Sequence, residues 1–257
     1  MLLRLRVRLP DRPGSLGQVA RTLGVTGADI VQMVVLERVG GRAVDDFTVI
    51  WPAAAPVDRI LAGLAAIPGV TVEGVWRSVG APAVGGADVE LVGQVAANPS
   101  DGVATLADAV PGLLSADWAA VVAVAADWAR SGDAGESGPS VVYASWRAPQ
   151  PLRAPDVTPL RPRAFDGADG ARFAAAPFGR AGLVLLAARS GETSADPALP
   201  PPAFHVTEVD RLAQLVRASA LVLAGRLEVA GRPDPPAARP EPWPVNPAAR
   251  FAAALDR

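Results

Sequence analysis

The stretch LPDRPGSL, residues 9–16, decides the fold of the N-terminal part of the chain. Pro13 suits the first turn of a helix, where its missing N–H needs no partner. Gly14 allows another backbone or a ligand to approach closely. The first N–H groups of a helix lack partners within it, and the helix dipole makes this end positive. The stretch therefore predicts a strand-to-helix turn that suits a carboxylate.

The patterns on both sides of this turn predict a ferredoxin-like unit. Apolar residues alternate with Arg before the turn, a helical spacing follows it, and Gly40-Gly41 marks a hairpin. The expected strands are residues 3–9, 29–39, 43–51 and 70–77, and the expected helices are 13–23 and 57–67. The order is βαββαβ, in which right-handed crossovers place the first strand between the third and the fourth.

Residues 9–16 and the segment Gly27-Ala28-Asp29-Ile30, set in this frame, resemble the ACT domain family over residues 1–77. ACT domains are regulatory modules that typically bind amino acids, often between two copies. The resemblance implies a ligand site and a homodimer associated through sheet edges. The implied ligand-binding residues are Asp11, Arg12, Pro13, Gly14, Ser15, Leu16, Ala28, Asp29 and Ile30.

Asp29 departs from the family pattern, which commonly has Asn at this position. An ionised Asp accepts a hydrogen bond from an ammonium group but cannot donate one to a carboxylate. The expected arrangement places the ligand carboxylate on the helix N–H groups and its ammonium on Asp29. The alternative is that Asp11 caps the helix and the site stays empty.

Three arginines, Arg4, Arg6 and Arg8, lie on the other face of the first expected strand. Acidic residues on neighbouring strands, namely Asp45, Asp46 and Glu73, offer cross-strand partners. We expect these charges to pair on a solvated face of the sheet.

Residues 88–229 predict a second α+β domain, joined to the first by a Gly-rich linker at residues 78–87. Helical patterns at 89–95 and 102–114 precede apolar strands at 118–126, 140–147, 170–178 and 182–189. A long irregular segment at 148–167 interrupts them. A final amphipathic helix is expected to be capped by Thr207, with Asp210 completing a capping box. A Pro-rich tail with a possible short terminal helix occupies residues 230–257.

The segment from Phe204 to Asp210 and the order of elements around it resemble a GAF domain, a small-molecule sensor with an antiparallel sheet and flanking helices. The resemblance carries no ligand residue over to this chain. The alternative is an α+β domain that lacks a pocket and only packs or dimerises.

The composition excludes several classes of chemistry. The 257 residues include no Cys, one His and 24 basic residues that are all Arg, against 26 acidic ones. These absences exclude thiolate catalysis, Schiff bases and Cys- or multi-His metal sites, so no metal, cofactor or catalytic residue is expected. The net charge of −2 argues against nucleic-acid binding, and no apolar run is long enough for a membrane span. His205 is expected to be a hydrogen-bonded loop residue, and Trp118 and Trp146 are expected in the core.

The sequence therefore predicts a cytoplasmic, non-enzymatic regulatory sensor. A small metabolite, most plausibly an amino acid, would bind the ACT-like domain and signal through dimer geometry to a downstream protein of unknown identity. Two alternatives are a hydrolase-type enzyme in the second domain and a dimerisation or scaffold module without a ligand.

Overall fold

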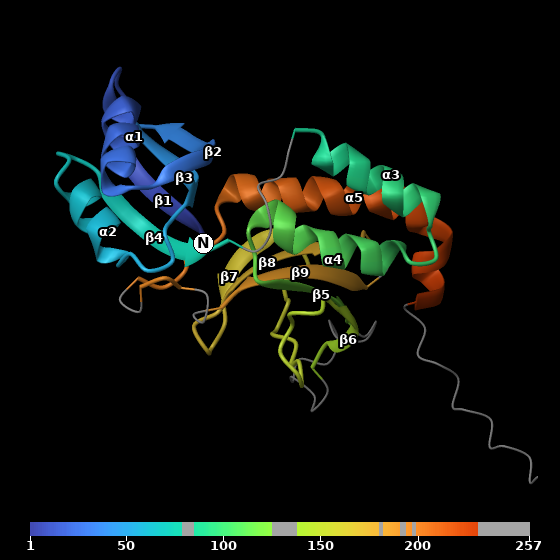
Figure 1. Cartoon of the computed structure of the whole chain (residues 1–257). Helices are drawn as coiled ribbons and strands as arrows, with labels where there is room; N and C mark the ends of the chain where they lie inside the picture. Colours follow the sequence, from blue (N-terminus) through green and yellow to red (C-terminus); the bar gives the residue numbers. More distant parts are fainter. Residues whose placement is uncertain (79–84, 125–137, 180–181, 191–193, 197–198, 231–257) are drawn as a thin grey trace, which may run out of the picture.

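The computed structural model describes residues 1–78, 85–124, 138–179, 182–190, 194–196 and 199–230 (Figure 1). The chain forms two α+β units, each with its own antiparallel sheet, and this confirms the predicted fold class. The Pro-rich tail from residue 231 onward and most of the expected linker, residues 79–84, lie outside the described residues. None of the helices in the described ranges is long and apolar enough to cross a membrane.

The first unit has the predicted βαββαβ order. Its elements are β1 (Leu2–Pro10), α1 (Ser15–Thr26), β2 (Asp29–Val39), β3 (Arg42–Ile50), α2 (Asp58–Ala65) and β4 (Thr71–Arg77). The sheet order β2-β3-β1-β4 places β1 between β3 and β4, as expected from right-handed crossovers. The apolar side chains of β1 pack with α1 and α2 in one core, so both helices cover the same face of the sheet.

The second unit begins with α3 (Ala87–Ala97) and α4 (Gly102–Leu114) and ends with α5 (Val206–Ala230). Between them lie β5 (Trp118–Ala123), β6 (Ser140–Ala144), β7 (Arg163–Asp166), β8 (Arg172–Pro177) and β9 (Leu183–Arg189), in the sheet order β6-β5-β9-β8-β7. The helices cover one face of this sheet (Figure 1). Apolar residues of the segment 148–165 pack against the other face, over Trp118 and Phe173.

Three local expectations for the second unit are wrong. The segment 148–167 is not wholly irregular, because it contains β7. Trp146 is 83% exposed and contacts Arg147 through its ring, whereas Trp118 is buried as expected. Helix α5 is capped by His205, whose backbone N–H donates to Glu208 at 2.8 Å, so Glu208 takes the capping-box role expected of Asp210.

The outer face of the first sheet is not solvated, and this corrects the expectation for the arginine stripe, which consists of Arg4, Arg6 and Arg8. Arg4 and Arg6 are 8% and 2% exposed because the second unit covers this face. The expected ion pairs do form, from Arg6 to Asp46 at 2.8 Å and from Arg8 to Glu73 at 2.6 Å. Asp45 does not join them, because its strand position places it on the helix-covered face with Phe47.

The segment that leads from β9 to α5 ties the two units together. Ser194 forms a bridge with Trp76 of β4, and the N–H of Ala195 donates to the Val75 carbonyl at 3.0 Å. Pro202 packs so closely on Gly74 that a Cβ there would lie 2.6 Å from its ring. The backbone of the second unit therefore continues the edge of the first sheet.

Candidate functional site

A cavity of about 370 Å³ lies at the N-terminus of α1, between this helix and the sheet. All eight residues of the predicted stretch 9–16 line it, together with residues of β2 and β3. The lining residues are Leu9, Pro10, Asp11, Arg12, Pro13, Gly14, Ser15, Leu16, Val35, Arg38, Ala43 and Asp45. The sequence-predicted turn is thus one wall of a concave site.

The N-terminus of α1 is open toward this cavity. Gly14 takes the cap position with φ of 90°, a left-handed conformation that favours glycine, and no side chain caps the helix. The first turn contains no acidic residue that would neutralise the helix dipole. An anion in the cavity would therefore meet N–H groups that no carboxylate of the helix competes for.

Asp11 does not cap the helix. Its carboxylate instead accepts hydrogen bonds from Nε and Nη2 of Arg38 at 2.6–3.1 Å. The N–H of Asp11 donates to the Gly41 carbonyl at 2.8 Å, which fixes the turn against the β2–β3 hairpin. This finding contradicts the expectation that Asp11 caps the helix.

Asp45 adds a buried carboxylate to the same cavity. The residue is 3% exposed, and its Oδ1 has no hydrogen-bond partner among the described residues. Burial raises the pKa of Asp45 above its ordinary value, and the neighbouring Asp46 adds to this rise, whereas Arg38 opposes it.

The structure separates Ala28, Asp29 and Ile30 from the turn. Asp29 pairs with Ile50, which in turn pairs with Leu2, whereas the turn follows Pro10 at the other end of β1. Eight strand residues span about 26 Å. Within one chain, Asp29 therefore cannot contact a ligand bound at Gly14.

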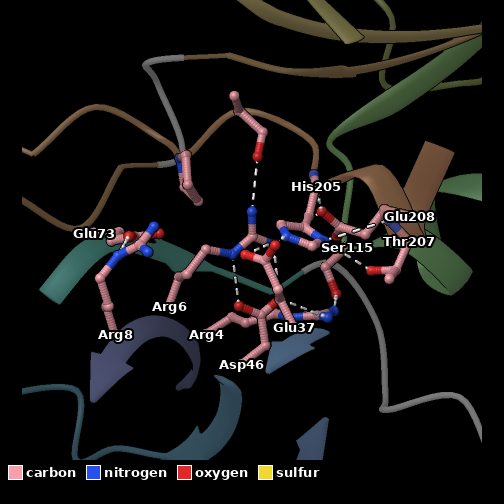
Figure 2. A network of polar contacts seen from close by, with 12 residues as sticks. Arg4, Arg6, Arg8, Glu37, Asp46, Glu73, Ser115, His205, Thr207 and Glu208 are labelled. Carbon is pink, nitrogen blue, oxygen red and sulfur yellow. Dashed lines mark hydrogen bonds and ion pairs between the residues drawn. The ribbon is translucent and has the colours of Figure 1, made fainter. Parts of the chain in front are cut away.

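A second cavity of about 250 Å³ lies between the two units, where α4 and the start of α5 face the first sheet. Its charged groups already have partners: Arg4 pairs with Asp46, Arg211 with Asp88, and Glu208 with both Arg6 and Arg189. Figure 2 shows Arg6 reaching between Asp46 and Glu208. We assign this cluster to the joining of the two units rather than to ligand binding.

His205 has the local contacts of a capping residue. Its Nδ1 accepts from the Thr207 N–H at 3.3 Å and lies 3.0 Å from the Thr207 hydroxyl, and its Nε2 lies 3.6 Å from Glu37 (Figure 2). These contacts satisfy the imidazole at the start of α5. No group of three or more His, Asp or Glu side chains within the described ranges could hold a metal ion.

No family model matches this chain, and no curated protein matches it. Among solved structures, a formyltetrahydrofolate deformylase from Pseudomonas putida KT2440 is similar over 29% of this chain and 28% of its own, with 20% identity and a TM-score of 0.26. An unknown protein from Galdieria sulphuraria is similar over 37% of this chain and 62% of its own, with 20% identity and a TM-score of 0.27. This chain thus spans less than two thirds of either, and neither likeness carries an argument about function.

Sequence reasoning missed the two strand residues that complete the α1 cavity, Arg38 and Asp45. One signal for Asp45 was available, because it shares the strand parity of the inward-facing Ala43 and Phe47. No comparable signal marks Arg38, whose role depends on the hairpin folding back against the turn.

Proposed function

We propose that the chain is a regulatory sensor that binds an amino acid in the α1 cavity and transmits binding through the second unit and a dimer. The observation that carries this proposal is the uncapped N-terminus of α1 facing a cavity that also contains a buried carboxylate. A zwitterion matches both features, because the helix end attracts its carboxylate and the acidic side chain attracts its ammonium.

The buried contacts between the two units supply a route for the signal. Trp76 of β4 donates from Nε1 to the Ser115 carbonyl at 3.2 Å, and Arg6 of β1 pairs with Glu208 of α5 at 2.9 Å. We therefore expect movement of the first sheet to shift the start of α5. Ligand binding transmits a signal by this route if its affinity differs between two arrangements of the units.

The edge strand β2 suits pairing with a second copy of the chain. Its outer side chains include the exposed residues Val31, Met33, Val34, Val35 and Val39. Long apolar edges of this kind tend to pair with another strand. An antiparallel self-pairing centred on Val34 would place Met33 opposite Val35 and Val31 opposite Glu37 of the other copy, so apolar side chains meet at its centre.

A screen of the twenty L-amino acids by thermal shift and calorimetry tests ligand binding. Leu16→Glu introduces a carboxylate at the open N-terminus of α1. The negative charge interacts favourably with the positive end of the helix dipole, so it competes with the ligand carboxylate for this position. We expect this variant to bind at least tenfold more weakly. Gln18→Glu, on the same helix but outside the cavity lining, is the matched control and should bind as the unmodified chain does. Absence of any binding amino acid would refute the proposed function.

Sedimentation velocity tests the dimer. Val34→Lys would place two ammonium groups opposite each other at the centre of the proposed strand pair, and like charges in this position are destabilising. We expect a dimer for the unmodified chain and a monomer for this variant. A monomeric unmodified chain would contradict the dimer while leaving ligand binding open to its own test.

A further inference from the structure

Asp45 is the carboxylate in the α1 cavity that forms no ion pair among the described residues. The two neighbouring carboxylates have ion-pair partners of their own. Asp11, on the turn, pairs with Arg38, and Asp46, on the opposite face of β3, pairs with Arg4 and Arg6. The Oδ1 atom of Asp45 lacks a hydrogen bond in the described structure, although the residue is only 3% exposed.

A buried carboxylate without an ion pair destabilises the folded chain unless a cation binds to it. A buried charge without a partner is unfavourable, and a buried carboxylate oxygen without a donor adds to this cost. Arg38 donates from Nε and Nη2 to Asp11, and the Oδ1 atom of Asp45 receives no hydrogen bond from it. Because Asp45 lines the cavity, a cationic group bound there can supply the missing hydrogen bond and charge.

We propose that Asp45 binds the ammonium group of an α-amino acid whose carboxylate lies at the N-terminus of α1. This inference rests on the proposed function and assigns to Asp45 the role that the sequence suggested for Asp29. The two charged ends of one ligand then lie on two walls of one cavity within a single chain, and the second copy is not needed to complete the site.

The other cavity walls indicate the kind of amino acid. Leu9, Leu16, Val35 and Ala43 present aliphatic surface beside Asp45. A bare divalent cation fits less well, because such ions usually take six or more oxygen ligands and Asp11 is already paired with Arg38. An aliphatic α-amino acid therefore matches the lining better than a metal ion or a highly polar ligand does.

Calorimetry with L-alanine, L-valine and L-leucine, each compared with its 2-hydroxy acid, tests the inference without any mutation. The hydroxy acids keep the carboxylate and the side chain but replace the ammonium by a neutral hydroxyl. We expect at least one amino acid to bind and its hydroxy acid to bind at least about 30-fold more weakly, as when one partner of a buried charge pair is removed. Equal binding of the two would overturn the role of Asp45.

Two matched variants locate the ammonium contact. Asp45→Asn should weaken amino-acid binding at least about 30-fold, whereas Asp29→Asn should leave it unchanged. Circular dichroism and thermal unfolding establish that each variant is folded before binding is measured. Loss of binding in Asp29→Asn with retention in Asp45→Asn would overturn the inference but keep the proposed function. Failure of the unmodified chain to bind any amino acid would overturn both.

Discussion

Arg6 of the first unit and Glu208 of the second form an ion pair at 2.9 Å, with side chains that are 3% and 6% exposed. Arg6 also donates to Asp46 and to the Ala203 carbonyl, and Glu208 also accepts from Arg189 (Figure 2). Buried pairs of this kind are costly to break, because removal of one partner leaves the other charge without compensation. Loss of either partner is therefore expected to destabilise the contact between the two units.

Arg6→Met should lower the free energy of unfolding by about 3 kcal/mol, because it leaves the buried carboxylates of Asp46 and Glu208 with fewer cations. Arg8→Met is the matched control on the same strand. Its partner is Glu73, and the two side chains are 41% and 27% exposed, so we expect a loss below about 1 kcal/mol. Urea denaturation of both variants measures the difference. Equal losses would show that the buried pair contributes no more than the exposed one.

Glu208 should make the interface sensitive to acid. Burial alone raises its pKa, but Arg189 and Arg6 outweigh that effect and lower the pKa from 4.5 to about 2. A group whose pKa is lowered on folding stabilises the protein above its unfolded pKa and loses this contribution as the pH falls through the folded value. We expect the thermal stability to fall between about pH 4.5 and pH 2.

A variant isolates the contribution of this residue. Glu208→Gln should be less stable than the unmodified chain at pH 7, and the difference should shrink as the pH approaches 2. Glu90→Gln, at an exposed position of α3, serves as the control and should show no such convergence. A difference for Glu208→Gln that is constant with pH would refute the assignment.

The local patterns predicted the first unit well because its signals are short in range. The alternation along β1, the Pro13-Gly14 turn and the Gly40-Gly41 hairpin each depend on neighbours in sequence. Even the position of β1 in the sheet follows from the handedness of two crossovers.

The environment of the arginine stripe could not be predicted in this way. Whether Arg4 and Arg6 face water depends on a second unit that lies more than a hundred residues away in sequence. The same reason explains Asp29, which the family resemblance grouped with Gly14 although the length of β1 separates them. Residue type and spacing indicated which groups bear charge, but only the tertiary arrangement shows which of them meet.

His205 should matter for the stability of α5 through its side-chain acceptor. His205→Ala removes the Nδ1 atom that accepts from the Thr207 N–H, and loss of an N-cap typically costs about 1 kcal/mol. His205→Asn supplies another acceptor that is well suited to this position and should restore most of the loss. Chemical denaturation of the two variants measures this. Equal destabilisation by Ala and Asn would mean that contacts other than the cap, such as the one with Glu37, dominate.

Asp45→Asn should make the ligand-free protein more stable at neutral pH, in contrast to most substitutions of buried residues. Burial raises the pKa of Asp45 in the folded state, and the negative charges of Asp46 and Asp11 raise it further. The positive charge of Arg38 opposes this rise. The charged form is therefore disfavoured by folding, and the unmodified chain loses stability as the pH rises from 3.8 through the raised value. We expect the variant to gain about 0.5–2 kcal/mol at pH 7.5, a range typical of single stabilising substitutions.

The gain should shrink as the pH falls toward 3.8 and vanish below it, where the carboxyl group is largely protonated in both the folded and the unfolded chain. Thermal unfolding of the two proteins across this pH range measures the difference directly. A residue with a purely structural role would give the opposite sign at neutral pH, because its replacement would remove a favourable contact. A gain in stability together with a loss of amino-acid binding is the combination expected of a carboxylate kept for a ligand rather than for the fold.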